Sequence, residues 1–96
     1  MINPETSILA LCFKYPDMLP VIRTKVAVKM FTSKKNAQIF WSCLKLKDDN
    51  KLVDSVTISQ YIKSNKKAYA VFDDESVLFN CLSEITTTEV KASSYQ

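Results

Sequence analysis

The chain has 96 residues, 47 % of them apolar, and a net charge of +3, which fits one domain with a single hydrophobic core and excludes a disordered chain. No apolar run approaches the ~18 residues of a membrane span, and the N-terminus lacks a signal-peptide pattern. We therefore expect one cytoplasmic domain over residues 1–96, without membrane association.

Two residue types, glycine and histidine, are missing from the sequence. Phosphate-binding loops need glycine for close backbone approach, so a Walker A loop and a dinucleotide fingerprint are excluded. Histidine is the usual general base and a common metal ligand. The three cysteines (Cys12, Cys43 and Cys81) form no C-x-x-C pair and have apolar neighbours, so we expect buried free thiols. We expect no catalytic residues, no cofactor and no metal site.

The first predicted helix begins at Asn3-Pro4-Glu5. Asn3 is a suitable cap, Pro4 is tolerated at the first helical position, and Glu5 complements the positive start of the helix. Pro16 ends this helix, and a second, short helix begins at Asp17. The apolar positions expected on the inner faces are Ile8, Leu9, Leu11, Cys12 and Tyr15, then Leu19, Ile22 and Val26.

Residues 25–30 alternate between apolar and other side chains with the period of two that is typical of a strand. No other part of the chain offers a partner strand, and a lone strand leaves its backbone groups without hydrogen bonds. We therefore predict an irregular or helical connector for these residues.

The third and longest predicted helix is capped by Thr32 or Ser33. Apolar residues then cover a wide arc, which indicates a helix that is buried on two sides. We expect this helix at the centre of the core, with Trp41 among its buried residues, and a polar loop over residues 47–51. The two apolar stripes are Ala37, Phe40, Trp41 and Leu44, and Ile39, Cys43 and Leu46.

Two further helices are predicted in the second half of the chain. Thr57 and Gln60 have the spacing of a capping box, and residues 64–67 end that helix. A short apolar segment, residues 68–72, precedes the last helix, which Asp73 or Asp74 caps and residues 86–88 break. The apolar faces are Ile58, Tyr61 and Ile62, then Val77, Leu78, Cys81, Leu82 and Ile85. These elements predict an all-α fold, a compact orthogonal bundle of about five to six short helices.

The remaining candidates for chemistry are carboxylates, lysines and aromatic rings. We interpret the acids as solvated caps, because no pattern sets two of them into an apolar pocket. The lysines can touch phosphate and the rings can stack on bases, but a net charge of +3 is low for a DNA-binding domain. These candidates are Asp48, Asp49, Asp73, Asp74, Glu75 and Glu84; Lys34, Lys35, Lys45, Lys47, Lys66 and Lys67; and Tyr15, Phe40, Trp41 and Tyr61.

Three stretches of sequence, taken in this order, carry a resemblance to a known protein family. The first is P-E-T-S-I-L-A-L at residues 4–11, followed by Y-P-D-M-L at residues 15–19. The second is M-F-T-S at residues 30–33, leading into Ile39-Phe40. The third, and the most specific, is V-D-S-V-T-I at residues 53–58 with Y-I-K after it. Together they resemble the N-terminal domain of DnaB-type replicative DNA helicases.

This resemblance implies a non-catalytic collar domain. Such a domain assists assembly of the helicase ring, pairs with neighbouring copies through a C-terminal helical hairpin, and offers a surface to primase or a helicase loader. The hairpin would have residues 75–85 as its first arm and residues 89–96 as its second. The chain would then divide into a globular part, residues 1–67, and a helix with the start of a hairpin, residues 74–96. DNA contact by the domain itself would be weak or absent.

The last helix carries the predicted interface. Phe79 lies off the apolar stripe of this helix, which indicates that the helix is covered on more than one side. The residues predicted for the interface are Ser76, Phe79, Asn80 and Ser83.

Two other functions remain open from the sequence. The helicase-binding C-terminal domain of DnaG-type primases has a similar fold, but the start at Met1 and the cap before Ile58 favour the helicase. The lysine clusters would also suit a free-standing helical DNA-binding or regulatory protein, whose binding would depend strongly on salt.

Overall fold

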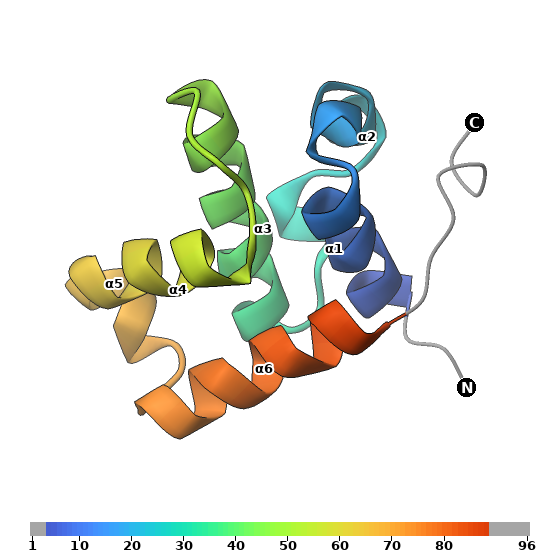
Figure 1. The fold of residues 1–96 in the computed structure, drawn as a ribbon. Coiled ribbons are helices and arrows are strands. Elements are labelled where there is room, and N and C mark those ends of the chain that lie inside the picture. Colours follow the sequence, from blue (N-terminus) through green and yellow to red (C-terminus); the bar gives the residue numbers. More distant parts are fainter. Residues whose placement is uncertain (1–3, 89–96) are drawn as a thin grey trace.

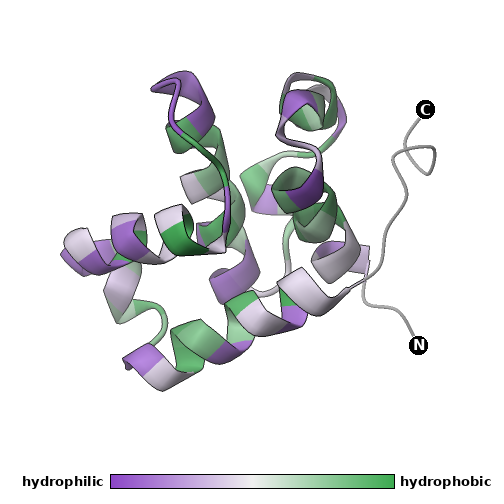
Figure 2. Ribbon diagram, viewed as in Figure 1, coloured by the Kyte–Doolittle hydropathy of each residue, from purple (hydrophilic) through white to green (hydrophobic). Residues whose placement is uncertain are grey.

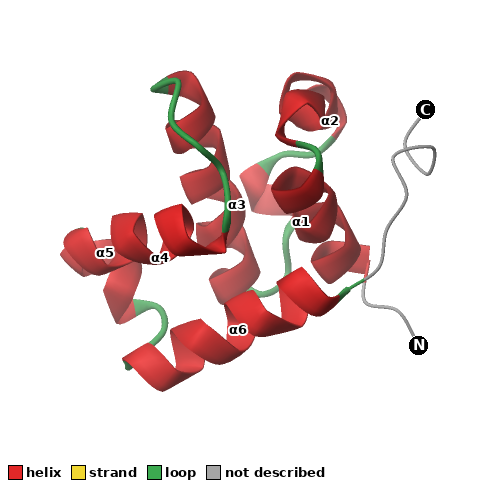
Figure 3. Cartoon of the chain, in the orientation of Figure 1, coloured by secondary structure: helices red, strands yellow, loops and turns green. Residues whose placement is uncertain are grey.

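Residues 4–88 are described by the computed structural model and form six α-helices with two short 3-10 turns (Figure 1). No strand occurs in this part of the chain (Figure 3), so the all-α prediction is confirmed. The predicted cap Asn3 and the predicted second hairpin arm, residues 89–96, lie outside the described residues. The elements are α1 (Pro4–Lys14), η1 (Pro16–Met18), α2 (Leu19–Lys25), η2 (Val28–Met30), α3 (Lys34–Asp48), α4 (Ser55–Ser64), α5 (Lys66–Ala70) and α6 (Glu75–Thr87).

Side-chain caps determine where the last four helices begin. Each cap oxygen accepts a hydrogen bond from the backbone N–H three residues later, which satisfies one of the donors that a helix start leaves unpaired. The donor–acceptor distances lie between 2.8 and 3.3 Å. The caps are Ser33 for α3, Asp54 for α4, Asn65 for α5 and Asp74 for α6.

Two predicted boundaries are wrong for the same reason. The capping box at Thr57 is not formed, because α4 begins earlier and the Thr57 hydroxyl and N–H both donate to Asp54. Residues 68–72 are not a separate apolar segment, because Asn65 starts a new helical turn, α5, immediately after α4 ends. In both places an acidic or amide side chain competes with a nearby hydroxyl for the cap, and the sequence pattern alone ranks them poorly.

The chain turns at two left-handed residues without using glycine. Asn50 has φ 58° and Asp73 has φ 69°. At the end of α3, the N–H of Lys51 donates to the carbonyl of Leu46 and the N–H of Asn50 to that of Lys47, which is the Schellman arrangement. Asparagine and aspartate tolerate this conformation better than other residues with a side chain, so they replace glycine here.

The first half of the chain follows its predictions at Pro16 and in the connector, with two differences. Tyr15, expected on an inner face, is 38 % exposed, and Asp17 lies in η1, so that α2 begins at Leu19. α1 ends before Pro16, and Tyr15 leaves the helical region with φ −129° and ψ 70°, as expected for a residue that precedes proline. The connector after α2 has extended backbone at Val26 and Ala27 and then the single turn η2. The prediction of an irregular or helical connector is confirmed.

The core lies between α1, α3, α4 and α6. α1 packs against α3 and α6, and α4 packs against α3, α5 and α6. In Figure 1, α3 runs steeply while α4 and α6 lie across it, and hydrophobic and hydrophilic positions alternate along α6 (Figure 2). The largest fully buried side chains are Phe40, Phe72, Leu9, Leu11, Leu19, Ile22, Ile39, Leu46, Ile58, Ile62, Leu78 and Ile85.

Trp41 is not in the core, contrary to the prediction. The buried side of α3 is formed by Ile39, Phe40, Cys43 and Leu46, and Phe40 packs on Phe31 with ring centroids 5.1 Å apart. Trp41 points from the edge of this face and is half-buried, because a position one residue after Phe40 is turned about 100° around the helix.

The cysteines follow the prediction in part. Cys12 and Cys43 are buried free thiols, and burial together with the neighbouring Cys12 thiol raises the pKa of Cys43. Cys81 is free but only half-buried, so its predicted full burial is wrong. It lies on α6 at the edge of the buried face, and burial raises its pKa as well.

The Glu5 carboxylate joins the starts of α1 and α3. It accepts hydrogen bonds from the Thr32 hydroxyl (2.5 Å), the Thr32 N–H (2.9 Å), the Ser33 N–H (3.3 Å) and the Asn36 amide (3.2 Å). The Thr32 hydroxyl has the largest influence, and together these donors lower the pKa of Glu5 from 4.5 to about 2 against the opposing effect of partial burial.

The edge position of Trp41 predicts unequal costs for two neighbouring truncations. Phe40→Ala should lower the free energy of unfolding by about 3–5 kcal/mol, because it leaves a cavity in the core. Trp41→Ala should cost only about 1–2 kcal/mol, because part of its surface already contacts water. Urea denaturation followed by circular dichroism measures both, and equal losses would place Trp41 in the core after all.

The low pKa of Glu5 predicts a loss of stability in acid. A carboxyl whose pKa is lowered in the folded state stabilises it fully above the unfolded value of 4.5, and this contribution disappears as the pH falls from about 4.5 to about 2. Glu5→Gln should therefore be less stable than the wild type near neutral pH, and the difference should shrink in acid. Urea midpoints measured across this range test it, with Glu84→Gln, the loss of an exposed carboxylate on α6, as the charge-matched control.

Candidate functional site

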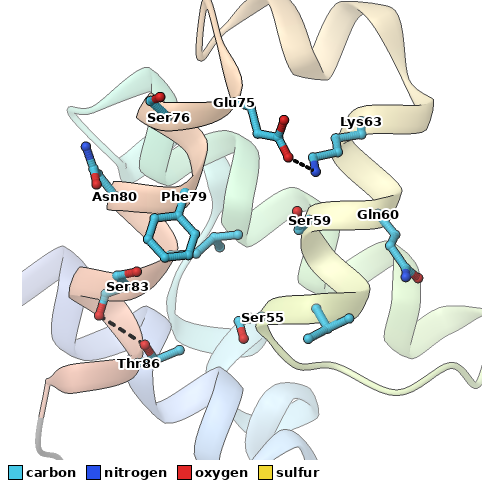
Figure 4. A pocket seen from close by; sticks show the side chains of 12 residues that line it. Ser55, Ser59, Gln60, Lys63, Glu75, Ser76, Phe79, Asn80, Ser83 and Thr86 are labelled. Carbon is cyan, nitrogen blue, oxygen red and sulfur yellow. Dashed lines mark hydrogen bonds and ion pairs between the residues drawn. The ribbon is translucent and has the colours of Figure 1, made fainter.

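A groove of about 850 Å³ lies between α4 and α6. α6 supplies one wall and α4 the other, and Figure 4 shows Phe79 on α6 with Ser59 and Gln60 on α4. The lining residues are Ser55, Val56, Ser59, Gln60 and Lys63 from α4, and Glu75, Ser76, Phe79, Asn80, Leu82, Ser83 and Thr86 from α6.

The periodicity of α6 explains why Phe79 is exposed. Leu78, Leu82 and Ile85 are buried at spacings of four and three residues, and they form the face that packs on the core. Phe79 is one position further round the helix and has 67 % of its surface exposed. Phe79 therefore contributes apolar surface to the groove and not to the core.

α4 presents a matching apolar residue on the opposite wall. Ile58 and Ile62 bury one face of this helix, whereas Val56 in its first turn is 63 % exposed and lines the groove. Leu82 is 5 % exposed and also lines the groove. The groove therefore contains an apolar strip of Val56, Leu82 and Phe79.

The rest of the lining is polar but carries no net charge. The charged residues in the lining are Lys63 and Glu75, and they form an ion pair across the groove (Figure 4). Hydroxyl and amide side chains supply the other polar groups, and the Thr86 hydroxyl donates to the Ser83 carbonyl at 3.0 Å. An apolar strip with a neutral polar rim is typical of a protein interface and unlike a phosphate-binding surface.

All four residues predicted for the interface line this groove. Ser76, Phe79, Asn80 and Ser83 lie along the outer side of α6. The residues of α4 that line the groove were not predicted from the sequence. Val56 was visible as an apolar residue off the Ile58 and Ile62 face, in the same way as Phe79, but the pairing of the two helices is a tertiary contact that no local pattern reveals.

Comparison with known proteins identifies the family. A model of the family described as DnaB-like helicase N terminal domain matches residues 1–96, the whole chain. The chain belongs to this family. Neither the curated protein sequences nor the solved structures contain a match. The resemblance drawn from the three sequence stretches is confirmed, and the family makes the chain an N-terminal domain of the replicative-helicase type.

Three of the six acidic candidates in this DnaB-like domain have structural partners. Asp48 pairs with Arg23 at 2.9 Å, Asp74 caps α6, and Glu75 pairs with Lys63. Among residues 4–88, no group of three or more histidine, cysteine or acidic side chains is arranged to hold a metal ion. Within the same residues, every helix is too short or too polar to cross a lipid bilayer.

The structure separates some of the basic and aromatic candidates and brings others together. Lys47 pairs with Asp17 at 3.4 Å, and Phe40 is buried, so it cannot stack on a base. Trp41 lies beside Tyr61, with ring centroids 6.1 Å apart. Lys34 and Lys67 line a second, smaller groove together with Trp41.

The exposure of Phe79 predicts that this residue contributes little to folding. Phe79→Ser should change the free energy of unfolding by less than about 0.5 kcal/mol, as for other surface substitutions. The adjacent Leu78→Ala should cost about 2–5 kcal/mol, because Leu78 is 1 % exposed. Urea denaturation of dilute protein compares them, and a large loss for Phe79→Ser would mean that the α4/α6 groove is closed in solution.

Proposed function

We propose that this domain is the non-catalytic N-terminal collar of a replicative DNA helicase, and that it associates with other proteins through the α4/α6 groove. The observation that carries the proposal is the exposed Phe79, which lines a neutral groove together with the exposed Val56 of α4. The chain matches the family over its whole length. The occupants proposed are neighbouring copies during ring assembly, and primase or a helicase loader. The proposed location is the cytoplasm.

The division of the chain is part of the proposal. Residues 1–67 would form the globular part, and residues 74–96 would supply a helix and the start of a hairpin that continues toward neighbouring copies. α6 is suited to both tasks, because its buried face packs on α1 and α4 while its outer face carries Phe79.

The size of the apolar strip limits the affinity. Burying one large apolar side chain is worth about 1.5–3 kcal/mol, and two such residues only partly offset the roughly 4–15 kcal/mol of freedom lost on association. We therefore expect weak self-association of this domain alone, in the range of about 0.1–1 mM. Contact with DNA would be weak or absent, because the groove has no unpaired cation in its lining.

Light scattering tests this proposal. The mass in solution should rise with concentration up to about 1 mM, at low and high salt alike, and should not change when single-stranded DNA is added. Phe79→Glu should abolish the rise, because it puts a charge into the apolar strip. Leu52→Glu is the matched control, since Leu52 is 68 % exposed outside the groove, and it should associate like the wild type.

Two outcomes would contradict the proposal. A chain that stays monomeric at every concentration would exclude self-assembly through this groove. A monomer that binds DNA in a salt-sensitive way would support the alternative of a small DNA-binding protein, and the lysines would then become the site.

A further inference from the structure

A second groove, of about 440 Å³, lies between α3 and the segment that contains α5. It shares no lining residue with the α4/α6 groove, so it does not belong to the proposed assembly surface. Its lining residues are Val28, Lys34, Ala37, Gln38, Trp41, Asn65, Lys67, Ala68 and Val71.

Small and medium-sized apolar residues make up much of the lining of this second groove. They are Ala37 of α3, Ala68 of α5, Val28 and Val71. The two amide side chains in the lining already have partners within the domain. Asn65 caps α5, and Gln38 donates to the Ser42 hydroxyl at 3.4 Å. The groove therefore suits a bulky apolar side chain better than a polar one.

The charges around the second groove are all positive. Lys34 and Lys67 line it, and the ammonium of Lys45 lies 5.5 Å from the centroid of the Trp41 ring. No residue of the lining is acidic, and none of these three lysines takes part in an ion pair within residues 4–88. This contrasts with the α4/α6 groove, where the lysine and the glutamate neutralise each other.

The position of Trp41 argues against a nucleic acid as the occupant. Lys45 lies over its ring and the Tyr61 ring packs beside it at 6.1 Å, so a base could stack on Trp41 only by displacing Lys45. Single-stranded nucleic acid is usually held by open aromatic faces along a continuous basic track. Here two lysines flank one small apolar cavity.

We propose that the α3/α5 groove binds an acidic segment of a partner protein, which inserts one bulky apolar side chain between Ala37 and Ala68. Carboxylates on either side of that side chain face Lys34 and Lys67. The apolar side chain supplies most of the affinity, and the charges orient the segment and speed its association.

Trp41 provides a direct readout, because it is the single tryptophan of the chain and lines the groove. The probe is a capped acidic pentapeptide with a central phenylalanine, titrated against tryptophan fluorescence. Binding should shift the emission and saturate with a Kd between about 10 µM and 1 mM. The same peptide with central alanine, and a peptide with lysines in place of the acids, should bind at least about 10-fold more weakly.

Two double charge-reversal variants distinguish binding in this groove from general electrostatic attraction between the acidic peptide and the basic domain. Lys34→Glu with Lys67→Glu should weaken binding by about 10-fold or more. Lys51→Glu with Lys66→Glu changes the net charge equally at exposed positions outside the lining, and should retain binding within about 3-fold at moderate salt. Circular dichroism checks that both variants remain folded.

Three results would overturn the inference. One is the absence of any fluorescence change with the acidic peptide up to about 1 mM. Another is an equal loss of binding in the two double variants. The third is tighter binding of an oligothymidylate about ten nucleotides long than of the peptide, which would assign the groove to single-stranded nucleic acid.

Discussion

The carboxylate of Glu5 joins α1 and α3, the two helices on which α6 and α4 pack. Its four hydrogen bonds join the first turn of α1 to the residues that start α3. The positive N-terminal end of α3 favours a negative charge at this point. The hydrogen-bond donors offset part of the free-energy cost of removing the Glu5 carboxylate from water. Because α6 packs on α1 and α4 packs on α3, the relative placement of α1 and α3 also determines the width of the groove between α4 and α6.

The two grooves of the domain differ in the charge balance of their lining, which influences what each groove can bind. The α4/α6 groove has an exposed aromatic residue and a neutralised ion pair, so apolar burial must supply its affinity. The α3/α5 groove has small apolar residues and cations without acidic partners in the described chain, so it discriminates by charge as well as by shape. A domain with two chemically distinct surfaces can contact different partners at once, which would suit the proposed collar role.

The local sequence pattern predicts most of the helices, but it does not predict how each helix packs against its neighbours. The spacing of apolar residues predicts five of the six helices but not α5, which begins after the Asn65 cap. The outlying Phe79 identifies one wall of the α4/α6 groove. The pattern cannot choose between Asp54 and Thr57 as a cap, because both offer an oxygen at short range. It also misassigned Trp41, since a wide apolar arc does not say which edge faces the neighbouring helix. The α4 wall, with Val56, depends on how α4 crosses α6, and this contact joins residues about 20 positions apart in the sequence.

A weak contact at Phe79 is compatible with a strong assembly because copies in a ring are not free of one another. Once other parts of a chain hold two neighbours together, a second contact forms within the assembly at an effective concentration in the millimolar range. An interface with an intrinsic Kd near that value is then substantially occupied without being permanent. The modest apolar strip of Val56, Leu82 and Phe79 is therefore suited to the proposed collar, whereas a larger strip would promote association of free chains.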